Sequence, residues 1–295
     1  MKPAPFRYHR PATVDEAVEV LAAVGPDGKV LAGGQSLVPM LNMRLAAPAN
    51  LVDINRVAGL DYVAADGSGV RVGATARHTD VERDTAAFEA VPLLRRALQS
   101  VAHPTIRNRG TTVGSLAHAD PAGELTAVLA VLGGTVQIAS TQGERSVTAD
   151  EFFVGPLESC LADGELAVSA FFPRPPGRTG SAWLEVARRH GDYAMCGVGA
   201  LVTLDDDAGV VEARAGYISV GSTPVVLDLT DPVRGSAADS ADWAAAGRLA
   251  QGGVEPEADI HATAEYRRHL VGVLTARALR AAAADAAAQN AEDRG

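Results

Sequence analysis

The chain has 295 residues, 47% of them hydrophobic, and is long enough to bury the cores of two globular domains. Its 26 Lys and Arg residues and 36 Asp and Glu residues give a net charge of −10, which disfavours binding to nucleic acid. Because no apolar run reaches about 18 residues and no secretory signal is recognised, we expect no integral membrane segment and a cytoplasmic location.

The supply of metal ligands is small. Cys160 and Cys196 are the only cysteines, too few for a disulfide framework or for the thiolate ligands of an all-cysteine iron–sulfur cluster. The seven histidines show neither an HExxH pattern nor zinc-site spacing. We therefore predict no metal site in this chain, and any associated iron–sulfur chemistry would reside in another chain.

The first 57 residues predict a small α/β unit. Residues 13–16 have the spacing of a capping box, and the helical periodicity after them ends near Gly25. Residues 29–32 and 51–54 predict short buried strands. A glycine pair ends the first of these strands, and a second helix is expected to begin directly after it.

Residues 58–176 predict a mixed α+β unit. Residues 70–72 and 136–138 have the composition of strands, and residues 124–132 that of a helix. Thr79 and Glu82 repeat the capping-box spacing before another helical region. The unit is expected to end in the PRPPG segment that closes at Gly177, because its prolines continue neither a helix nor a strand.

The remaining residues predict an antiparallel sheet with helices. The tight turn at 206–209 joins two of its strands, and its adjacent aspartates lack the ligand spacing of a calcium loop, which favours a solvated hairpin tip. The Ala-rich, polar end of the chain is expected to fray. Strands are predicted at 183–188, 198–204 and 211–220, and helices at about 240–250 and 262–284.

The first candidate binding motif is Ala32-Gly33-Gly34-Gln35-Ser36, between a predicted strand and a predicted helix. Small residues there would let backbone N–H groups approach a phosphate or pyrophosphate. The motif is neither a GxGxxG fingerprint nor a Walker loop. An ordinary glycine turn is the alternative interpretation.

The second motif is Thr111-Thr112-Val113-Gly114-Ser115, which precedes a connection that contains two carboxylates. Hydroxyls, backbone N–H groups and carboxylates together suit the phosphates and sugar hydroxyls of a nucleotide. The alternative is a loop that Thr and Asp side chains stabilise through their own backbone.

Several motifs in order resemble one family, and together they cover nearly the whole chain. They are similar to the FAD-binding medium subunits of aerobic carbon monoxide dehydrogenases and related molybdenum hydroxylases, and more distantly to the flavin domain of xanthine dehydrogenase. The motifs are PxxFxYxRPxTVDEAVxxL at the start, AGGQSLVPMLNMRL, LVDINRV, RNRGTTVGSLAHADPAGEL, ARRHGDYA at 187–194 and VGSTPV at 220–225.

The resemblance assigns roles to both glycine-containing segments. It implies that Ala32–Ser36 wraps the FAD pyrophosphate and that Thr111–Ser115 supports the nucleotide from the opposing domain. The family's TIGG pattern reads TTVG here, with Val113 in place of one glycine. Because a β-branched residue disfavours positive φ, the backbone path of this segment is left open.

Four further positions are implied to contact the cofactor. Glu124 matches an acidic FAD contact, and Asp120 lies in the same connection. Tyr193 matches the position beside the isoalloxazine, and Leu161 is expected to pack on the ring. Without the resemblance, Tyr193 would be interpreted as a core aromatic.

The implied fold is α+β, with two domains. A PCMH/VAO-type FAD-binding domain is expected at 1–176, in subdomains of about 1–57 and 58–176. A C-terminal domain of the carbon monoxide dehydrogenase flavoprotein type, an antiparallel sheet with helices, is expected at 177–285, before a frayed tail at 286–295.

The implied function is electron transfer inside a larger oxidoreductase. In such complexes a large subunit holds the molybdopterin cofactor, a small subunit holds [2Fe-2S] clusters, and electrons reach an external acceptor through FAD. The resemblance implies a dimer of heterotrimers, with no substrate-oxidising residues in this chain. The substrate, which would be carbon monoxide, an N-heterocycle, an aldehyde or a ketone, and the acceptor are left open.

Two other classes of function stay open. One is a self-sufficient FAD-dependent oxidase with its own substrate site, which the lack of a recognisable acid–base or nucleophile constellation disfavours. The other is a non-catalytic nucleotide-binding scaffold.

Overall fold

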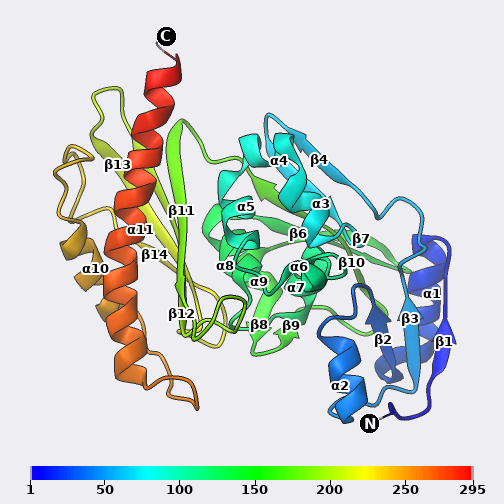
Figure 1. Cartoon of the computed structure of the whole chain (residues 1–295). Helices are drawn as coiled ribbons and strands as arrows, with labels where there is room; N and C mark the ends of the chain where they lie inside the picture. Colours follow the sequence, from blue (N-terminus) through cyan, green and yellow to red (C-terminus); the bar gives the residue numbers. More distant parts are fainter. Residues whose placement is uncertain (1, 294–295) are drawn as a thin grey trace.

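The computed structural model describes residues 2–293, with side chains described to Gln289. Three bodies follow one another in chain order: an N-terminal subdomain, a middle subdomain and a C-terminal domain (Figure 1). Along the described chain, no helix combines the length and the apolar character that crossing a membrane requires.

The N-terminal subdomain is a parallel sheet of order β1-β3-β2 with two helices. As predicted, Thr13 caps the first helix, and its hydroxyl accepts from the Glu16 N–H at 3.1 Å. The Glu16 carboxylate accepts from the Ala12 N–H at 2.7 Å, one residue before the cap. The elements are β1 (Arg7–His9), α1 (Val14–Val24), η1 (Gly25–Asp27), β2 (Gly28–Leu31), α2 (Leu37–Met43) and β3 (Asn50–Asp53).

The middle subdomain is a five-stranded antiparallel sheet of order β4-β5-β10-β6-β7, covered by helices. A β8-β9 hairpin extends beside it. The elements are β4 (Val63–Asp66), β5 (Gly69–Gly73), α3 (His78–Arg83), α4 (Thr85–Ala90), α5 (Pro92–Leu98), α6 (Pro104–Arg107), α7 (Thr112–His118), α8 (Glu124–Leu132), β6 (Thr135–Ser140), β7 (Gly143–Thr148), α9 (Ala149–Phe152), β8 (Phe153–Gly155), β9 (Glu158–Ser159) and β10 (Leu166–Pro173).

The predicted capping box of Thr79 and Glu82 is wrong. The N-cap of helix α3 lies two residues earlier, at Arg77, and the Asp80 carboxylate accepts from the Arg77 N–H at 2.9 Å. The two predicted residues contact other elements instead. The Thr79 hydroxyl donates to the Asn108 side-chain oxygen, and Glu82 forms an ion pair with buried Arg107 of α6.

The C-terminal domain begins with β11 at Arg178, five residues after Pro173 ends β10. Its four strands form the predicted antiparallel sheet, in the order β11-β12-β13-β14. At the β12–β13 turn the Asp205 carboxylate accepts from the N–H groups of Asp207 and Gly209. The elements are β11 (Arg178–Val186), β12 (Cys196–Leu204), β13 (Val210–Ile218), β14 (Val225–Asp228), α10 (Trp243–Gly252) and α11 (Ala264–Asp293).

The expected frayed tail at 286–295 is wrong for the residues that are described. Helix α11 continues to Asp293, and Ala286 is fully buried. A Cβ at Gly180 of β11 would lie 2.1 Å from the Ala282 carbonyl oxygen and 2.2 Å from the Ala286 nitrogen. The alanines therefore allow the helix backbone to lie directly on the sheet; residues 294 and 295 lie outside the described part.

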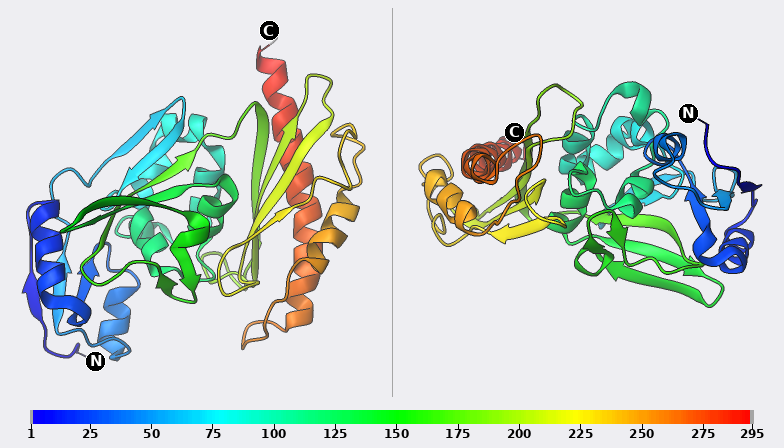
Figure 2. Two further views of the ribbon diagram at one scale, coloured as in Figure 1. Left: turned by 180° about the vertical axis from the view of Figure 1, so that it is seen from behind. Right: turned by 90° about the horizontal axis from the view of Figure 1, so that it is seen from below.

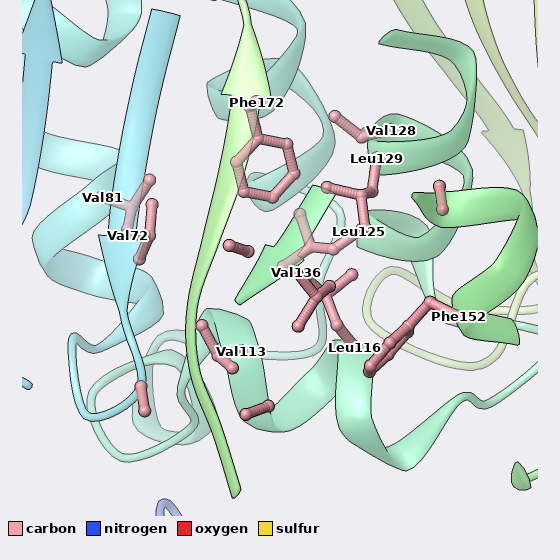
Figure 3. Packing of buried hydrophobic residues seen from close by; sticks show 14 of the residues in the cluster. Val72, Val81, Val113, Leu116, Leu125, Val128, Leu129, Val136, Phe152 and Phe172 are labelled. Atoms are coloured by element: carbon pink, nitrogen blue, oxygen red, sulfur yellow. The ribbon is translucent and has the colours of Figure 1, made fainter. Parts of the chain in front are cut away.

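Helix α8 joins the two domains. Every residue from Leu125 to Val131 is buried, because the helix contacts β10 of the middle subdomain and also β12, β13 and β14. Helix α11 covers the opposite face of the four-stranded sheet (Figure 2). Figure 3 shows α8 side chains Leu125, Val128 and Leu129 packing toward Val136 of β6 and Phe172 of β10.

One ion pair also crosses the domain boundary. The Arg96 guanidinium of α5 lies 2.6 Å from the Asp285 carboxylate of α11 and also donates to the Ser181 carbonyl of β11. Asp285 further accepts from the Ser181 N–H at 2.9 Å. Partial burial would raise the pKa of Asp285, but these hydrogen bonds hold it below its ordinary value.

We expect Arg96→Met to lower the free energy of unfolding by about 2 kcal/mol, because it leaves a partly buried carboxylate without its partner. Urea denaturation at pH 7 measures the loss, with Arg280→Met on the exposed side of α11 as a control of equal charge. Because folding lowers the pKa of Asp285, its ionised form stabilises the folded state above the ordinary Asp value of 3.8. The difference in stability between the parent and Arg96→Met should therefore shrink as the pH falls below that value. Equal stability of the two variants at pH 7 would contradict this role.

Candidate functional site

The predicted glycine motif forms the turn between β2 and α2. A Cβ at Gly33 would lie 2.4 Å from the Arg109 carbonyl oxygen and 2.7 Å from the Gly110 Cα, so the space is filled by the middle subdomain's backbone. Gly34 has a φ of 75°, in the left-handed region. Both positions therefore require glycine, one for close approach and one for conformation.

A cavity of about 380 Å³ opens beside this turn, between the N-terminal and middle subdomains. Ser36 is exposed and is not among the lining residues, and the Gln35 side-chain amide donates to the Gly33 carbonyl at 3.1 Å. The lining residues come from β2, the turn, α2, the end of β3 and the α6 region: Leu31, Ala32, Gly33, Gly34, Gln35, Val38, Pro39, Asp53, Asn55, Ile106 and Arg109.

Two residues that the sequence analysis missed hold this turn in place. The Asn55 side-chain amide donates to the Ala32 carbonyl at 2.8 Å. Arg77 donates to the Asn55 side-chain oxygen at 2.6 Å and to the Arg109 carbonyl at 2.8 Å. Asn55 lies in the LVDINRV motif, which is part of the family resemblance and could have indicated it as a site residue. Nothing in the local sequence distinguishes Arg77.

The second predicted motif is the first turn of α7. Thr111 is its N-cap, and its hydroxyl accepts from the Gly114 N–H at 3.2 Å. Val113 is helical and buried, and it is not among the residues with positive φ, so the open question about its backbone is answered. Thr112 is also buried, while Ser115 is half-buried.

This turn lies against the glycine motif. A Cβ at Gly114 would lie 3.9 Å from the Ala32 Cβ, and Gly110, just before the cap, is the residue that Gly33 approaches. The two motifs, separated by about 75 residues in sequence, are therefore neighbours across the subdomain boundary. Sequence spacing alone could not place them together, whereas the resemblance predicted this.

Carboxylates gather where α7 leads into α8. Asp120 accepts from the Ala122 N–H at 2.9 Å, and Glu124 is the first residue of α8. Burial raises the pKa of Glu124 from 4.5 to about 8, and the Glu185 and Asp120 carboxylates add to the rise. Glu124 therefore holds a proton at neutral pH in the absence of a ligand.

The C-terminal domain supplies Tyr193 through the loop at 187–195 that joins β11 to β12. This loop contacts the middle subdomain, since a Cβ at Gly191 would lie 2.6 Å from the His103 ring and 2.8 Å from the Ala102 carbonyl oxygen. Tyr193 is 66% exposed, which excludes the core-aromatic interpretation. Desolvation of its hydroxyl and the nearby Asp120 carboxylate raise its pKa.

Leu161 is not among the residues that line the cavity beside the glycine turn. It follows the β8-β9 hairpin, whose Leu157 N–H donates to the Ala119 carbonyl at 3.0 Å. Leu161 is half-buried and packs against the main apolar core. The structure therefore does not bring it to the cavity beside the glycine turn, and its predicted contact with the flavin ring stays a prediction.

These residues fit a large anionic nucleotide. The glycine turn has no room for a side chain at Gly33, a cavity opens beside the turn, and exposed Arg109 is among the residues that line this cavity. Protonated Glu124 and exposed Tyr193 provide neutral hydrogen-bond donors near the α7–α8 connection. The glycine turn and Arg109 thus offer phosphate-binding groups, and the α7–α8 connection offers neutral donors and an aromatic side chain.

We expect the stability of the ligand-free chain, relative to Glu124→Gln, to fall as the pH rises from 5 to 9. Because folding raises the Glu124 pKa from 4.5 to about 8, the folded state binds the extra proton between these values and loses stability as the pH rises through them. The relative loss should reach about 4 kcal/mol at pH 9 by thermal denaturation. A pH-independent difference, or the same trend for the exposed control Glu89→Gln, would contradict the assignment.

Two protein-family models match the chain. The family described as "FAD binding domain in molybdopterin dehydrogenase" matches residues 4–175, and "CO dehydrogenase flavoprotein C-terminal domain" matches residues 181–282. The unmatched residues 176–180 between them cover the end of the β10–β11 connection and the start of β11.

Curated relatives and solved structures agree with these matches. The chain is 40% identical to the 6-hydroxypseudooxynicotine dehydrogenase complex subunit alpha of Paenarthrobacter nicotinovorans, over 95% of each chain. It is 33% identical to the carbon monoxide dehydrogenase medium chain of Afipia carboxidovorans, over 97% of this chain and 99% of that one. Quinoline 2-oxidoreductase from Pseudomonas putida 86 matches with a TM-score of 0.91 and 37% identity, over 97% of this chain and 99% of that one. The chain therefore belongs to the family of FAD-binding medium subunits of molybdenum hydroxylase complexes and is an oxidoreductase subunit.

Proposed function

We propose that this chain is the electron-transfer subunit of a molybdenum-dependent hydroxylase. It would accept electrons from [2Fe-2S] clusters of a small partner subunit and pass them to an external acceptor. Substrate would be oxidised at the molybdopterin cofactor of a large partner subunit. The observation that carries the proposal is the glycine turn packed against Arg109–Gly110 beside the cavity, in a chain whose residues 4–175 match the FAD-binding family.

The residues described above suggest how FAD would be held. Its diphosphate would lie at Ala32–Ser36 and Thr111–Ser115, and Asp120, Glu124 and Tyr193 would surround the flavin end. Bound FAD would supply the capacity to take up two electrons and release them to an acceptor. The protein's own task would be to orient the ring, exclude water from one side and supply the Glu124 proton nearby.

The need for partner subunits follows from the ligands that this chain carries. Two cysteines are fewer than an iron–sulfur cluster requires, and Cys196 is buried within β12. Relatives are named as subunits of dehydrogenases for 6-hydroxypseudooxynicotine, caffeine and carbon monoxide. Similar chains that serve such different substrates support a substrate site in the large subunit.

We expect Gly33→Val to reduce the FAD content at least tenfold, because the side chain would displace the Arg109–Gly110 backbone behind the turn. The ratio of flavin to protein absorbance after gel filtration measures this, for the chain alone and co-expressed with its partners. Gly67→Val is the control, since a Cβ there meets no atom within 4 Å. Unchanged flavin content in Gly33→Val would contradict the assignment of the turn.

We expect the FAD-loaded chain alone to take up electrons from dithionite but not from any substrate of the complex. Anaerobic mixing followed at the flavin absorption band tests this, with the assembled complex as the positive control. Bleaching of the isolated chain by substrate would support a self-sufficient oxidase instead. Co-purification of three subunits in equal amounts, in a particle with twice the mass of one heterotrimer, would support the dimer of heterotrimers.

A further inference from the structure

Two arginines flank the glycine turn without forming an ion pair. Arg109 is exposed, lines the cavity, and its side chain forms no hydrogen bond or ion pair with any residue in the described range. Its backbone is nevertheless fixed, because its carbonyl accepts from Arg77 and lies behind Gly33. Arg109 is thus fixed at its backbone, and its side chain is without a partner among the described residues, in a residue that lines the cavity.

Arg77 is bound only to neutral acceptors. Its side chain donates to the Asn55 amide oxygen and to the Arg109 carbonyl, and no carboxylate of the described residues forms an ion pair with it. Asp80 accepts from its backbone N–H, and Asp53 and Asp61 attract it from farther away. Burial and the positive charge of Arg109 lower the pKa of Arg77, so the two cations repel each other across the turn.

The one carboxylate that lines the cavity is already bound. Asp53 accepts from the Tyr8 hydroxyl, from the Asn55 N–H at 2.9 Å and from the Asn55 side-chain amide at 2.6 Å. These hydrogen bonds hold the pKa of Asp53 below its ordinary value despite partial burial. Asp53 is therefore ionised and acts on Arg77, but its oxygens are engaged by Tyr8 and Asn55, and among the described residues it forms no ion pair with Arg109. Arg109 thus remains an unpaired cation at the cavity, in a chain whose net charge is −10.

We propose that Arg109 binds the diphosphate of FAD directly and that Arg77 positions the glycine turn for that contact. This inference rests on the proposed function and adds residues that neither glycine motif contains. A diphosphate would relieve the repulsion between the two guanidiniums and accept from Arg109 in the bidentate geometry that guanidinium groups favour. Riboflavin, which lacks phosphate, would gain nothing from Arg109.

The test compares three ligands on the full chain, alone and co-expressed with its partners: FAD, ADP and riboflavin. Arg109→Met should raise the Kd for FAD and for ADP about 10- to 100-fold and leave the Kd for riboflavin within about twofold. Arg109→Lys should recover part of the affinity. Arg83→Met, an exposed arginine at the end of α3, is the control and should bind all three ligands like the parent.

Salt dependence separates the two roles. The FAD affinity of the parent should decrease between about 50 and 500 mM salt. Arg109→Met should make this decrease smaller, because it removes the charge that salt screens. Arg77→Met should weaken FAD and ADP yet keep most of that salt dependence, because its effect acts through the position of the turn. Loss of salt dependence in Arg77→Met would overturn its positioning role.

The outcomes distinguish this inference from the proposed function. Unchanged FAD and ADP affinity in Arg109→Met, or an equal loss for riboflavin, would overturn the diphosphate contact while the FAD-binding role stands. If the parent protein binds ADP through Arg109 but binds no flavin, the diphosphate contact of Arg109 is supported and the proposed function is contradicted. A parent that binds none of the three ligands, alone or assembled, would overturn both.

Discussion

The structure depends on the complete burial of α8. Its residues Leu125–Val131 are apolar on all faces apart from Thr126, and they pack between a five-stranded sheet and a four-stranded sheet. Gly216 of β13 allows this, because a Cβ there would lie 2.9 Å from the Ala127 carbonyl oxygen. A helix buried on every side fixes the relative position of both domains, and its first residue, Glu124, is fixed with them.

The candidate site is held together differently on its two sides. On the C-terminal side, the Ser219 N–H donates to the Pro121 carbonyl at 2.8 Å, and its hydroxyl donates to the Ala194 carbonyl at 2.6 Å. Buried Arg267 of α11 donates to the Ser219 carbonyl at 2.7 Å. On the N-terminal side, the hydrogen bonds of Asn55 connect the subdomains. The loop that carries Tyr193 is therefore held through Ser219 and buried Arg267, whereas the glycine turn is held through the side chain of Asn55.

Local sequence determined most of the secondary structure, because caps and periodicity are encoded within a few residues. The cap at Thr13, the helix at 124–132 and the antiparallel strands of the C-terminal domain all follow from such patterns. Prediction from local sequence failed where contacts with residues distant in the chain decided the structure. Thr79 and Glu82 have cap spacing but bind other elements. The Ala-rich end of the chain is expected to fray as an isolated helix end, yet Ala286 is buried against β11.

For the site, sequence by itself determined that two glycine-containing segments suit a phosphate, and the motifs in order determined the family. Only the tertiary structure decided that Gly33 packs on the backbone of Arg109 and Gly110. It also decided that Arg77 anchors the turn through Asn55, and that Glu124 keeps its proton. Close approach, hydrogen bonding between subdomains and desolvation all depend on atoms that are far apart in the chain, so no local pattern encodes them.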